Sequence, residues 1–598
     1  MTINEKNIVI EKGNVFPLGI STCGCGILFS FACDKDKNCK LHLVNMRDGQ
    51  DIVIDLGEEY RTGNVRSCVI SLGDEKQSIK EILQKYYGYV YETDGEFLCD
   101  PYAVKIYGRE MYGKASDKLY SGFYFDDYDW EDDKSPDIKY EDMILYRMHV
   151  RGFTMDASSG VKCPGTYEGI IEKADYLKGL GVNAVLLMPA YDYNEIMKES
   201  DAYGVPAYAK ENALDNEKDI LCKLNYWGYT DDAAYFAPKA SYSANPRECN
   251  VSFKNMVKKL HQNGIEVIMD IHFGMDMDCY LMLECLRYWA YEYHVDGFKI
   301  NNNAFPEALV KRDNVLGDKK FITSYWDRNG AFSAGRFADY NDGSMINIRK
   351  FILSYEDQVS EYAERFIPES NKIADIRYVA DMNTFTLMDM VSYDKKHNEA
   401  NGENNQDGTD YNYSSGYGCE GPTRRKKINE ERMCQMKNAL ALLFMTYGTP
   451  MLLAGDEFSN SAGGNNNPYC QDNRTSYVDW KAYDKNTELF NYIKELIAIR
   501  KTALSSHSEI SFHGVLPWKA DYSPHSKSLG VLLSKNGVYI AINMDAEDKV
   551  FALPSAEGES KWKEKLWTRG NPEVKYENGL YSCNVPKKSI IIFISTRD

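Results

Sequence analysis

The middle of the chain alternates between short apolar runs and longer amphipathic runs from about residue 143 to 501. Runs such as Ala184–Met188 and Ile265–Met269 predict strands, and Phe253–Asn263 has the apolar spacing of a helix. Repeated strand–helix units favour parallel pairing, because each helix carries the chain back to the start of the next strand. A (β/α)8 barrel of the α/β class fits this length better than an open sheet.

Both flanks of this region have a different pattern, in which short strand-like runs are separated by Gly, Asp and Asn. Runs such as Gly26–Phe31 and Leu529–Leu533 predict a β-sandwich at each end. The first is expected to end near the acidic, aromatic segment Asp126–Pro136. The predicted domains are an N-terminal β-sandwich at 1–130, the barrel at 131–502 and a C-terminal β-sandwich at 503–598.

Charge and composition exclude several classes of function. The 598 residues include 70 Lys and Arg against 89 Asp and Glu, a net charge of −19, which disfavours binding to nucleic acid or anionic membranes. No apolar stretch reaches the length of a membrane span, and the N-terminus lacks a signal core, so we expect a cytoplasmic protein. Its 15 cysteines include no paired CxxC units, which predicts reduced thiols, no metal and no cofactor. The basic run Arg424–Lys427 is interpreted as the solvated start of a helix.

Several long motifs lie at or near the ends of the predicted strands. They are Tyr146–Thr154, Asn225–Tyr229, Phe236–Pro238, His397–Asn405, Gly448–Pro450, Gly455–Glu457 and Gly464–Asn473. In these motifs the chain resembles the isoamylase-type glycogen debranching proteins of the α-amylase clan, glycoside hydrolase family 13. Phe16–Gly19 and Asp100–Ala103 resemble a carbohydrate-binding module of family 48. The resemblance covers nearly the whole chain and implies action on α-glucans such as glycogen, starch or branched maltooligosaccharides.

The resemblance also implies where a catalytic triad would lie, and there the chain departs from the family. Members hydrolyse α-1,6 branch points with retention, using a carboxylate nucleophile, a carboxylic acid and a stabilising aspartate. The three positions hold Asn301, Ser324 and Asn383. An amide is a poor nucleophile, and a serine hydroxyl is too weak an acid to protonate a leaving oxygen near pH 7. We therefore expect no catalytic residues, and we expect these three side chains to converge at the C-terminal mouth of the barrel.

Two neighbouring features of the expected site differ as well. Lys299 stands where the family has an arginine, and it lacks the planar fork of a guanidinium. Asp270 of the third-strand motif is retained, but the rest of that motif reads His272 to Met275 and is followed by a short loop. Active relatives carry a long loop here, so the resemblance implies a more open cleft.

The aromatic side chains near these motifs suggest how a glucan would be held. Trp227, Tyr229, Tyr325 and Trp326 are candidates for stacking on glucose rings, together with Asp270 and Lys299 as polar substrate-binding residues. Aromatic rings pair an apolar face with a polar rim, which suits a sugar. Ordinary packing within the barrel is the alternative for each of these rings.

Three hypotheses follow for the function. The first is a catalytically inactive isoamylase-like protein that binds α-glucan or regulates its metabolism. The second is a debranching hydrolase or transferase with relocated catalytic residues. Asp381, expected on the same strand face as Asn383, and Asp327 are candidates, but a retaining pair must lie about 5 Å apart. The third is an assembly subunit without glucan binding, since the family contains inactive members that act as partners of an active isoamylase subunit.

Overall fold

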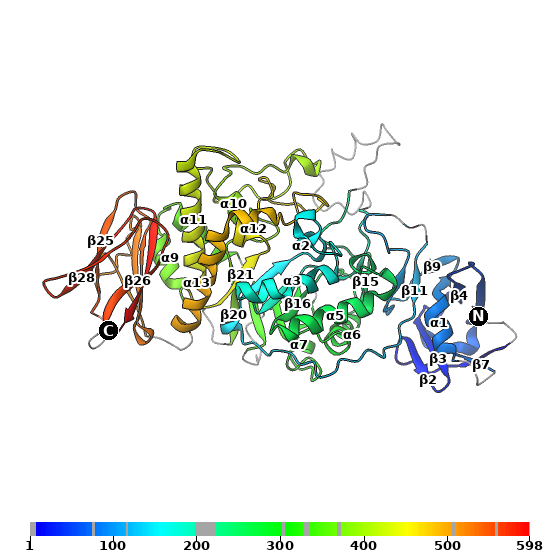
Figure 1. Cartoon of the computed structure of the whole chain (residues 1–598). Helices are drawn as coiled ribbons and strands as arrows, with labels where there is room; N and C mark the ends of the chain where they lie inside the picture. The colour runs from blue at the N-terminus through cyan, green and yellow to red at the C-terminus, as the bar shows by residue number, and fades with distance from the viewer. Residues whose placement is uncertain are drawn as a thin grey trace.

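The computed structural model describes residues 7–73, 78–114, 116, 118–197, 223–301, 305–324, 326, 335–340, 342–367, 372–504, 509–555 and 560–596. The chain forms a central barrel with antiparallel sheets on either side, and its termini lie at opposite ends of the molecule (Figure 1). The predicted fold class is confirmed.

Eight parallel strands close the barrel in chain order. They are β12 (Leu145–Met148), β13 (Ala184–Leu187), β16 (Glu266–Ile271), β17 (Gly297–Ile300), β18 (Lys320–Thr323), β19 (Phe337–Tyr340), β20 (Ile373–Tyr378) and β21 (Thr449–Leu453). The sixth strand, β19, was not recognised from the sequence, because its four residues mix polar and apolar side chains. A hairpin of β14 (Tyr191–Tyr193) and β15 (Ala233–Pro238) follows the second strand.

Helices surround the barrel (Figure 1). They are α2 (Val150–Thr154), α3 (Tyr167–Leu180), α5 (Cys249–Gln262), α6 (Cys279–Glu292), α7 (Glu307–Val310), α8 (Gly343–Ile352), α9 (Gln358–Arg365), α10 (Leu387–Met390), α11 (Lys426–Phe444), α12 (Lys481–Lys485) and α13 (Thr487–Ala503).

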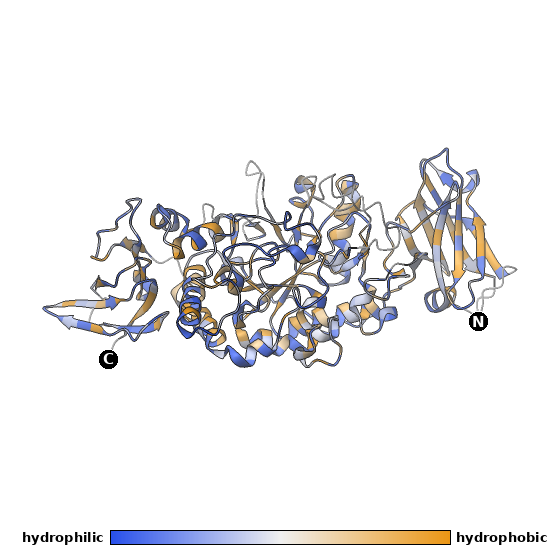
Figure 2. Ribbon diagram, turned by 90° about the horizontal axis from the view of Figure 1, so that it is seen from above, coloured by the Kyte–Doolittle hydropathy of each residue, from blue (hydrophilic) through white to orange (hydrophobic). Residues whose placement is uncertain are grey.

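The barrel strands and helices form where the sequence predicts them because their apolar side chains are buried. All residues of β13 and β16 are buried, as expected for strands covered on both faces. In α5 the buried face includes Phe253, Val257 and Leu260. Helix α3 begins at the side-chain cap Thr166 and ends at Gly181, whose φ of 103° suits glycine. Figure 2 shows the resulting mixture of polar and apolar residues along the outer helices.

The N-terminal region contains two antiparallel sheets that enclose their own core. One contains β1 (Ile8–Lys12), β2 (Gly19–Cys23), β3 (Gly26–Ala32), β6 (Arg61–Thr62) and β7 (Val65–Leu72). The other contains β4 (Cys39–Asn45), β5 (Asp51–Asp55), β8 (Tyr87–Thr93), β9 (Glu96–Leu98), β10 (Ile106–Tyr107) and β11 (Tyr120–Gly122), and helix α1 (Ile79–Tyr86) precedes β8.

The C-terminal region also contains two antiparallel sheets. Their strands are β22 (Ile510–His513), β23 (Ser528–Leu533), β24 (Val538–Asn543), β26 (Lys561–Trp567) and β29 (Ser589–Thr596), and β25 (Lys549–Leu553), β27 (Val574–Glu577) and β28 (Leu580–Val585). The domain limits near residues 130 and 502, and the likeness of the first region to a carbohydrate-binding module, stay predictions.

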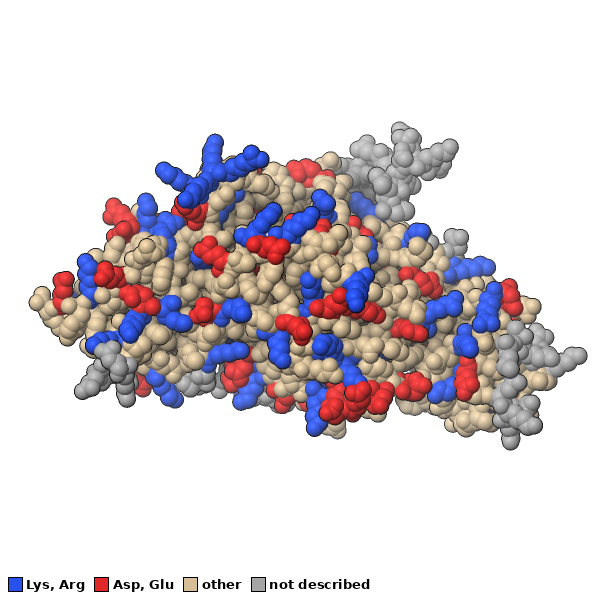
Figure 3. All heavy atoms as spheres, in the orientation of Figure 1, with Lys and Arg blue, Asp and Glu red and all other residues tan. Residues whose placement is uncertain are grey.

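The surface carries interspersed charges of both signs on the face in Figure 3. Basic side chains gather at the top of that view, over the start of α11. Residues 424–427 are exposed there, and Lys426 is the first residue of the helix. The interpretation of this run as a solvated helix start is confirmed. Within the described ranges, no helix combines the length and apolar character needed to cross a membrane.

A cluster of charged groups ties the acidic linker to the N-terminal end of the barrel. Asp133 accepts hydrogen bonds from His261 Nδ1 (3.0 Å) and His294 Nδ1 (2.7 Å). On its other side, His261 Nε2 lies 3.0 Å from Asp296, the residue before β17. Burial opposes a charged imidazole, but hydrogen bonds to Asp133 and Asp296 raise the pKa of His261 to about 9.

This cluster predicts a loss of stability at alkaline pH. The folded pKa of His261 lies above the unfolded value of 6.5, so its stabilising contribution is complete below pH 6.5 and is lost as the pH rises through about 9. The free energy of unfolding should fall by at most about 3 kcal/mol over this window, at ~1.4 kcal/mol per unit of pKa. Urea unfolding of wild type and His261→Gln at both ends of the window measures it. Parallel pH profiles for the two proteins would contradict the prediction.

Candidate functional site

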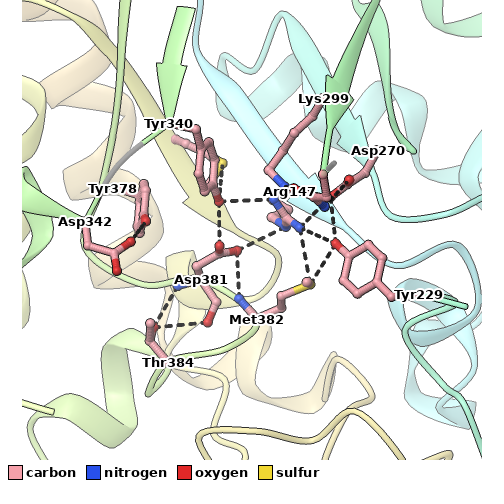
Figure 4. Close-up of polar contacts among 12 residues, drawn as sticks. Arg147, Tyr229, Asp270, Lys299, Tyr340, Asp342, Tyr378, Asp381, Met382 and Thr384 are labelled. Atoms are coloured by element: carbon pink, nitrogen blue, oxygen red, sulfur yellow. Dashed lines mark hydrogen bonds and ion pairs between the residues drawn. The ribbon is translucent and has the colours of Figure 1, made fainter. Parts of the chain in front are cut away.

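A buried arginine lies at the centre of the C-terminal mouth of the barrel (Figure 4). Arg147 of β12 is fully buried and bridges two carboxylates. Its Nη2 donates to Asp270 Oδ2 at 2.7 Å, and its Nε lies 3.0 Å from Asp381 Oδ1. Burial opposes the charged guanidinium, but Asp381 and the other surrounding acceptors hold the pKa of Arg147 well above its usual range. This arginine remains charged at every pH at which the protein folds.

The last residues of β17 complete the other side of Asp270. Lys299 Nζ donates to Asp270 Oδ2 at 3.1 Å and to Asn301 Oδ1 at 2.8 Å. The amide of Asn301 in turn donates to Asp270 Oδ1 at 2.8 Å. Burial, together with the neighbouring Arg147, lowers the pKa of Lys299, and Asp270 opposes that shift. Asn301 is therefore held as a structural bridge between an ammonium and a carboxylate.

Two tyrosine hydroxyls close the network. Tyr229 OH donates to Asp270 Oδ2 at 2.7 Å, and Tyr340 OH donates to Asp381 Oδ2 at 2.5 Å. Arg147 donates to both hydroxyl oxygens, at 3.0 Å and 3.1 Å. Two cations and two carboxylates thus form a central network, defined as Arg147, Tyr229, Asp270, Lys299, Asn301, Tyr340 and Asp381. Its formal charge is zero, and each carboxylate accepts from at least two donors.

The structure brings together five of the residues singled out in the sequence, namely Tyr229, Asp270, Lys299, Asn301 and Asp381. Ser324 directly follows β18 and is exposed. Because β17 and β18 pair Lys299 with Ile322, Asn301 and Ser324 leave their strands at the same level. Asn383 is exposed in the turn after β20. The mutual convergence of these three side chains stays a prediction.

The aromatic candidates have different surroundings. Trp227 is partly exposed and borders a small cavity beside Arg147. Trp326 is only 1% exposed; its Nε1 donates to Ala338 O at 2.8 Å, and its ring packs edge-on against Phe337. Its indole is a core side chain with no face open to a sugar, which corrects the stacking expectation for this residue. Tyr325 and Asp327 lie outside the described residues.

Asp381 does not lie on the strand face that the sequence predicted. Strand β20 ends at Tyr378, and residues 381–383 belong to the following turn, so the alternation of a strand does not apply to them. The turn directs Asp381 inward to Arg147 and places Met382 Sδ 3.2 Å from Arg147 Nη2. The thioether of Met382 therefore lies directly beside the guanidinium of Arg147. The cavity next to these two side chains has a volume of about 80 Å³.

Sequence reasoning missed the two residues that organise this site, Arg147 and Tyr340. Arg147 lies within a matched motif, and its position at the end of an apolar strand was the signal that could have found it. Tyr340 closes the unrecognised strand β19. Among the described residues, no three His, Cys, Asp or Glu side chains gather in a group that could hold a metal ion.

Comparison with known proteins relates this geometry to a family. The family described as "Alpha amylase, catalytic domain" matches residues 125–281. The chain is 30% identical to "Glycogen operon protein GlgX homolog" from Haemophilus influenzae, over 80% of this chain and 85% of that protein. It is 28% identical to "Isoamylase 1, chloroplastic" from Oryza sativa, over 86% of this chain and 76% of the relative.

Solved structures share the same architecture. A pullulanase from Paenibacillus barengoltzii, in complex with maltohexaose and α-cyclodextrin, superposes with a TM-score of 0.67 at 19% identity. The match covers 98% of this chain and 96% of that chain. At this level of identity the likeness concerns the fold.

Proposed function

The chain belongs to the isoamylase- and GlgX-like debranching family of the α-amylase clan, and from this premise we propose that it is a catalytically inactive member that binds α-glucan. In this proposal, the motifs that hold the catalytic residues of the family have lost those residues. Asn301, Ser324 and Asn383 occupy the positions of the nucleophile, the acid and the stabiliser. The single observation that carries the proposal is the neutral central network around Arg147.

The network supports the proposed inactivity because both carboxylates at the centre of the site, Asp270 and Asp381, are held in ion pairs and hydrogen bonds with neighbouring side chains. Retaining hydrolysis needs one ionised carboxylate facing the anomeric carbon and one protonated carboxyl facing the leaving oxygen. Asp270 is fully buried and accepts from Arg147, Tyr229, Lys299 and Asn301. Three of these donors contact Oδ2 and the fourth contacts Oδ1, so both oxygens are held within the fold and the buried carboxylate does not face a sugar.

Asp381 is a poor replacement for the lost acid. It pairs with Arg147 through Oδ1 and accepts from Tyr340 through Oδ2, so both of its oxygens are engaged within the fold. A general acid must instead face the leaving oxygen of a bound substrate. These contacts count against the alternative of an enzyme with relocated catalytic residues.

Retained glucan binding is supported by the relatives. They are named for isoamylase and for the glycogen operon, and a pullulanase of the same fold holds maltohexaose. In this chain Asn301, Ser324 and Asn383 keep hydrogen-bonding groups that suit sugar hydroxyls, while Trp227 keeps a partly exposed ring. Loss of acid chemistry therefore leaves groups that can bind a neutral carbohydrate.

Electrophoresis through gels that contain glycogen tests the binding. The protein should migrate more slowly than in a gel without polymer, because bound α-glucan holds it back, and dextran should have no such effect. Reducing-sugar release from the same samples should stay at the blank. Unchanged migration would overturn the proposed binding and favour the assembly-subunit hypothesis, in which the chain accompanies an active isoamylase subunit. Substantial sugar release would overturn the proposed inactivity.

A further inference from the structure

A second cavity lies at the junction between the barrel and the N-terminal sheets. We call it the junction groove. One wall is formed by Cys99, Asp100, Pro101, Ile106, Arg109 and Leu119, and the other by residues 231–235 together with Gly274, Asp276, Met277 and Leu281. Its volume is about 440 Å³, against about 80 Å³ for the cavity beside Arg147. Small-molecule sites in proteins usually measure about 300–1,000 Å³. Of these two cavities, only the junction groove has the size of an oligosaccharide site.

The first wall of the groove is held firmly on the barrel. Ala103 and Ile106 pack against Ala237 of β15, so an apolar contact joins the two walls at the base. Above it, Arg109 is 6% exposed and donates to Asp192 Oδ1 (3.0 Å) and Asp232 Oδ1 (2.7 Å). Leu119, just before β11, and Ala234 of β15 pack against the same apolar contact. A groove with rigid walls binds without a large ordering cost.

Part of the second wall of the groove is formed by the short connection between β16 and α6. Only residues 272–278 connect β16 to α6. Gly274 N donates to Tyr235 OH at 3.1 Å, which fixes this connection against β15. The next side chains, Met275 and Asp276, are exposed. The short connection therefore leaves open a space that reaches the N-terminal region.

The groove begins where the central network ends. Tyr229, which donates to Asp270, lies with its ring 5.7 Å from that of His272. His272 Nε2 in turn lies 3.7 Å from Asp231 Oδ1 on the groove rim. Tyr229 and His272 therefore link the central network to the rim of the groove.

The lining combines an apolar base with a polar rim. Leu119, Met277 and Leu281 supply apolar surface, and the carboxylates of Asp231 and Asp276 are exposed above it. A pyranose has a face of C–H groups and a rim of hydroxyls, so apolar contact below and carboxylate acceptors at the side match it. Arg109 is paired with Asp192 and Asp232, so the exposed carboxylates of Asp231 and Asp276 remain available as acceptors for hydroxyl groups.

We propose that the junction groove binds a maltooligosaccharide segment of α-glucan, beside the central network and outside it. This inference rests on the proposed function and names where the glucan is held. The cavity beside Arg147, with Met382 at its edge, is much the smaller of the two. The proposed glucan path runs from the cleft mouth toward the N-terminal region.

Calorimetric titration of the full chain with maltoheptaose tests the groove. Ala233→Trp fills the space between the walls, and binding is expected to weaken at least about tenfold because no pyranose fits there. The double variant Asp231→Ala, Asp276→Ala removes two hydroxyl acceptors from exposed positions, so the fold should persist, and the loss should again be about tenfold. Asp127→Ala, Asp132→Ala removes the same charge from exposed linker positions and should bind like wild type.

The outcomes separate this inference from the function on which it rests. Wild-type affinity in both groove variants overturns the groove, and if Trp227→Ala then abolishes binding, the glucan is held in the cleft and the proposed function stands. A wild-type protein that binds no maltoheptaose and no glycogen overturns both. Spermidine is the probe for a cationic ligand. Tight spermidine binding that is lost in the Asp231, Asp276 double variant, with maltoheptaose affinity unchanged, overturns the carbohydrate assignment.

Discussion

Incubation of the purified protein with glycogen or pullulan is expected to release reducing sugar at least about 10⁴-fold more slowly than an active isoamylase does. Acid–base assistance alone contributes about 10²–10⁴ to such a rate, and in the proposed function the acid position holds Ser324. The proposed nucleophile position holds Asn301, whose side-chain amide is bound to Asp270 and Lys299. Without a covalent route, the remaining groups have little to assist. A reducing-end assay over several hours measures the difference.

Restoration of the family residues provides the matching control. The variant Lys299→Arg, Asn301→Asp, Ser324→Glu, Asn383→Asp is expected to remain inactive, because Met382 and the short connection after β16 still shape the site. Release by the unmodified protein at an isoamylase-like rate, unaffected by Asn301→Ala, would instead establish a relocated catalytic site.

Replacement of Arg147 should cost more stability than any other change to the central network. Arg147→Met keeps the approximate shape but leaves Asp270 and Asp381 without their shared cation. Removal of one partner from a buried ion pair typically costs about 3–5 kcal/mol. Urea unfolding followed by tryptophan fluorescence measures the loss.

Two further variants check that the cause is the uncompensated charge. Arg365→Met removes the cation of a partly exposed pair with Glu361 and should cost less than about 1 kcal/mol. Adding Asp381→Asn to Arg147→Met should recover part of the stability, since the remaining buried pair of Lys299 and Asp270 is then neutral. Equal losses for Arg147→Met and Arg365→Met, or no recovery in the double variant, would contradict this account.

The order of the barrel strands could be predicted because it depends on patterns that are local in the sequence. The continuous apolar runs of β13 and β16 predict buried strands, and the apolar spacing of α5 predicts an amphipathic helix. The structure buries these side chains as expected. Strand β19 was missed because four residues of mixed character carry no such signal. The need for a strand here follows from the closed barrel, in which β19 pairs with β18 on one side and with β20 on the other.

Part of the candidate site could also be predicted, because some of its residues lie in motifs that are local in the sequence. Matched motifs marked Asp270, Lys299 and Asn301, and these three do lie within hydrogen-bonding distance of one another. Their common partner Arg147 was missed because its contacts come from strands far apart in the sequence. The stacking role for Trp326 failed because sequence order does not reveal which way a side chain turns after a strand. It turns into the core.

The neutrality of the central network has a consequence for how this lineage can change. A single Asn301→Asp step would place a new carboxylate where an amide now lies 2.8 Å from Asp270. Like charges at this separation repel strongly in a buried site, so the step would destabilise the fold before any catalysis was gained. Gain of activity would need several simultaneous changes, while each single change is disfavoured. If the protein is inactive as proposed, the buried charge balance thus opposes a stepwise recovery of hydrolysis, whereas residues outside the central network can change without disturbing it.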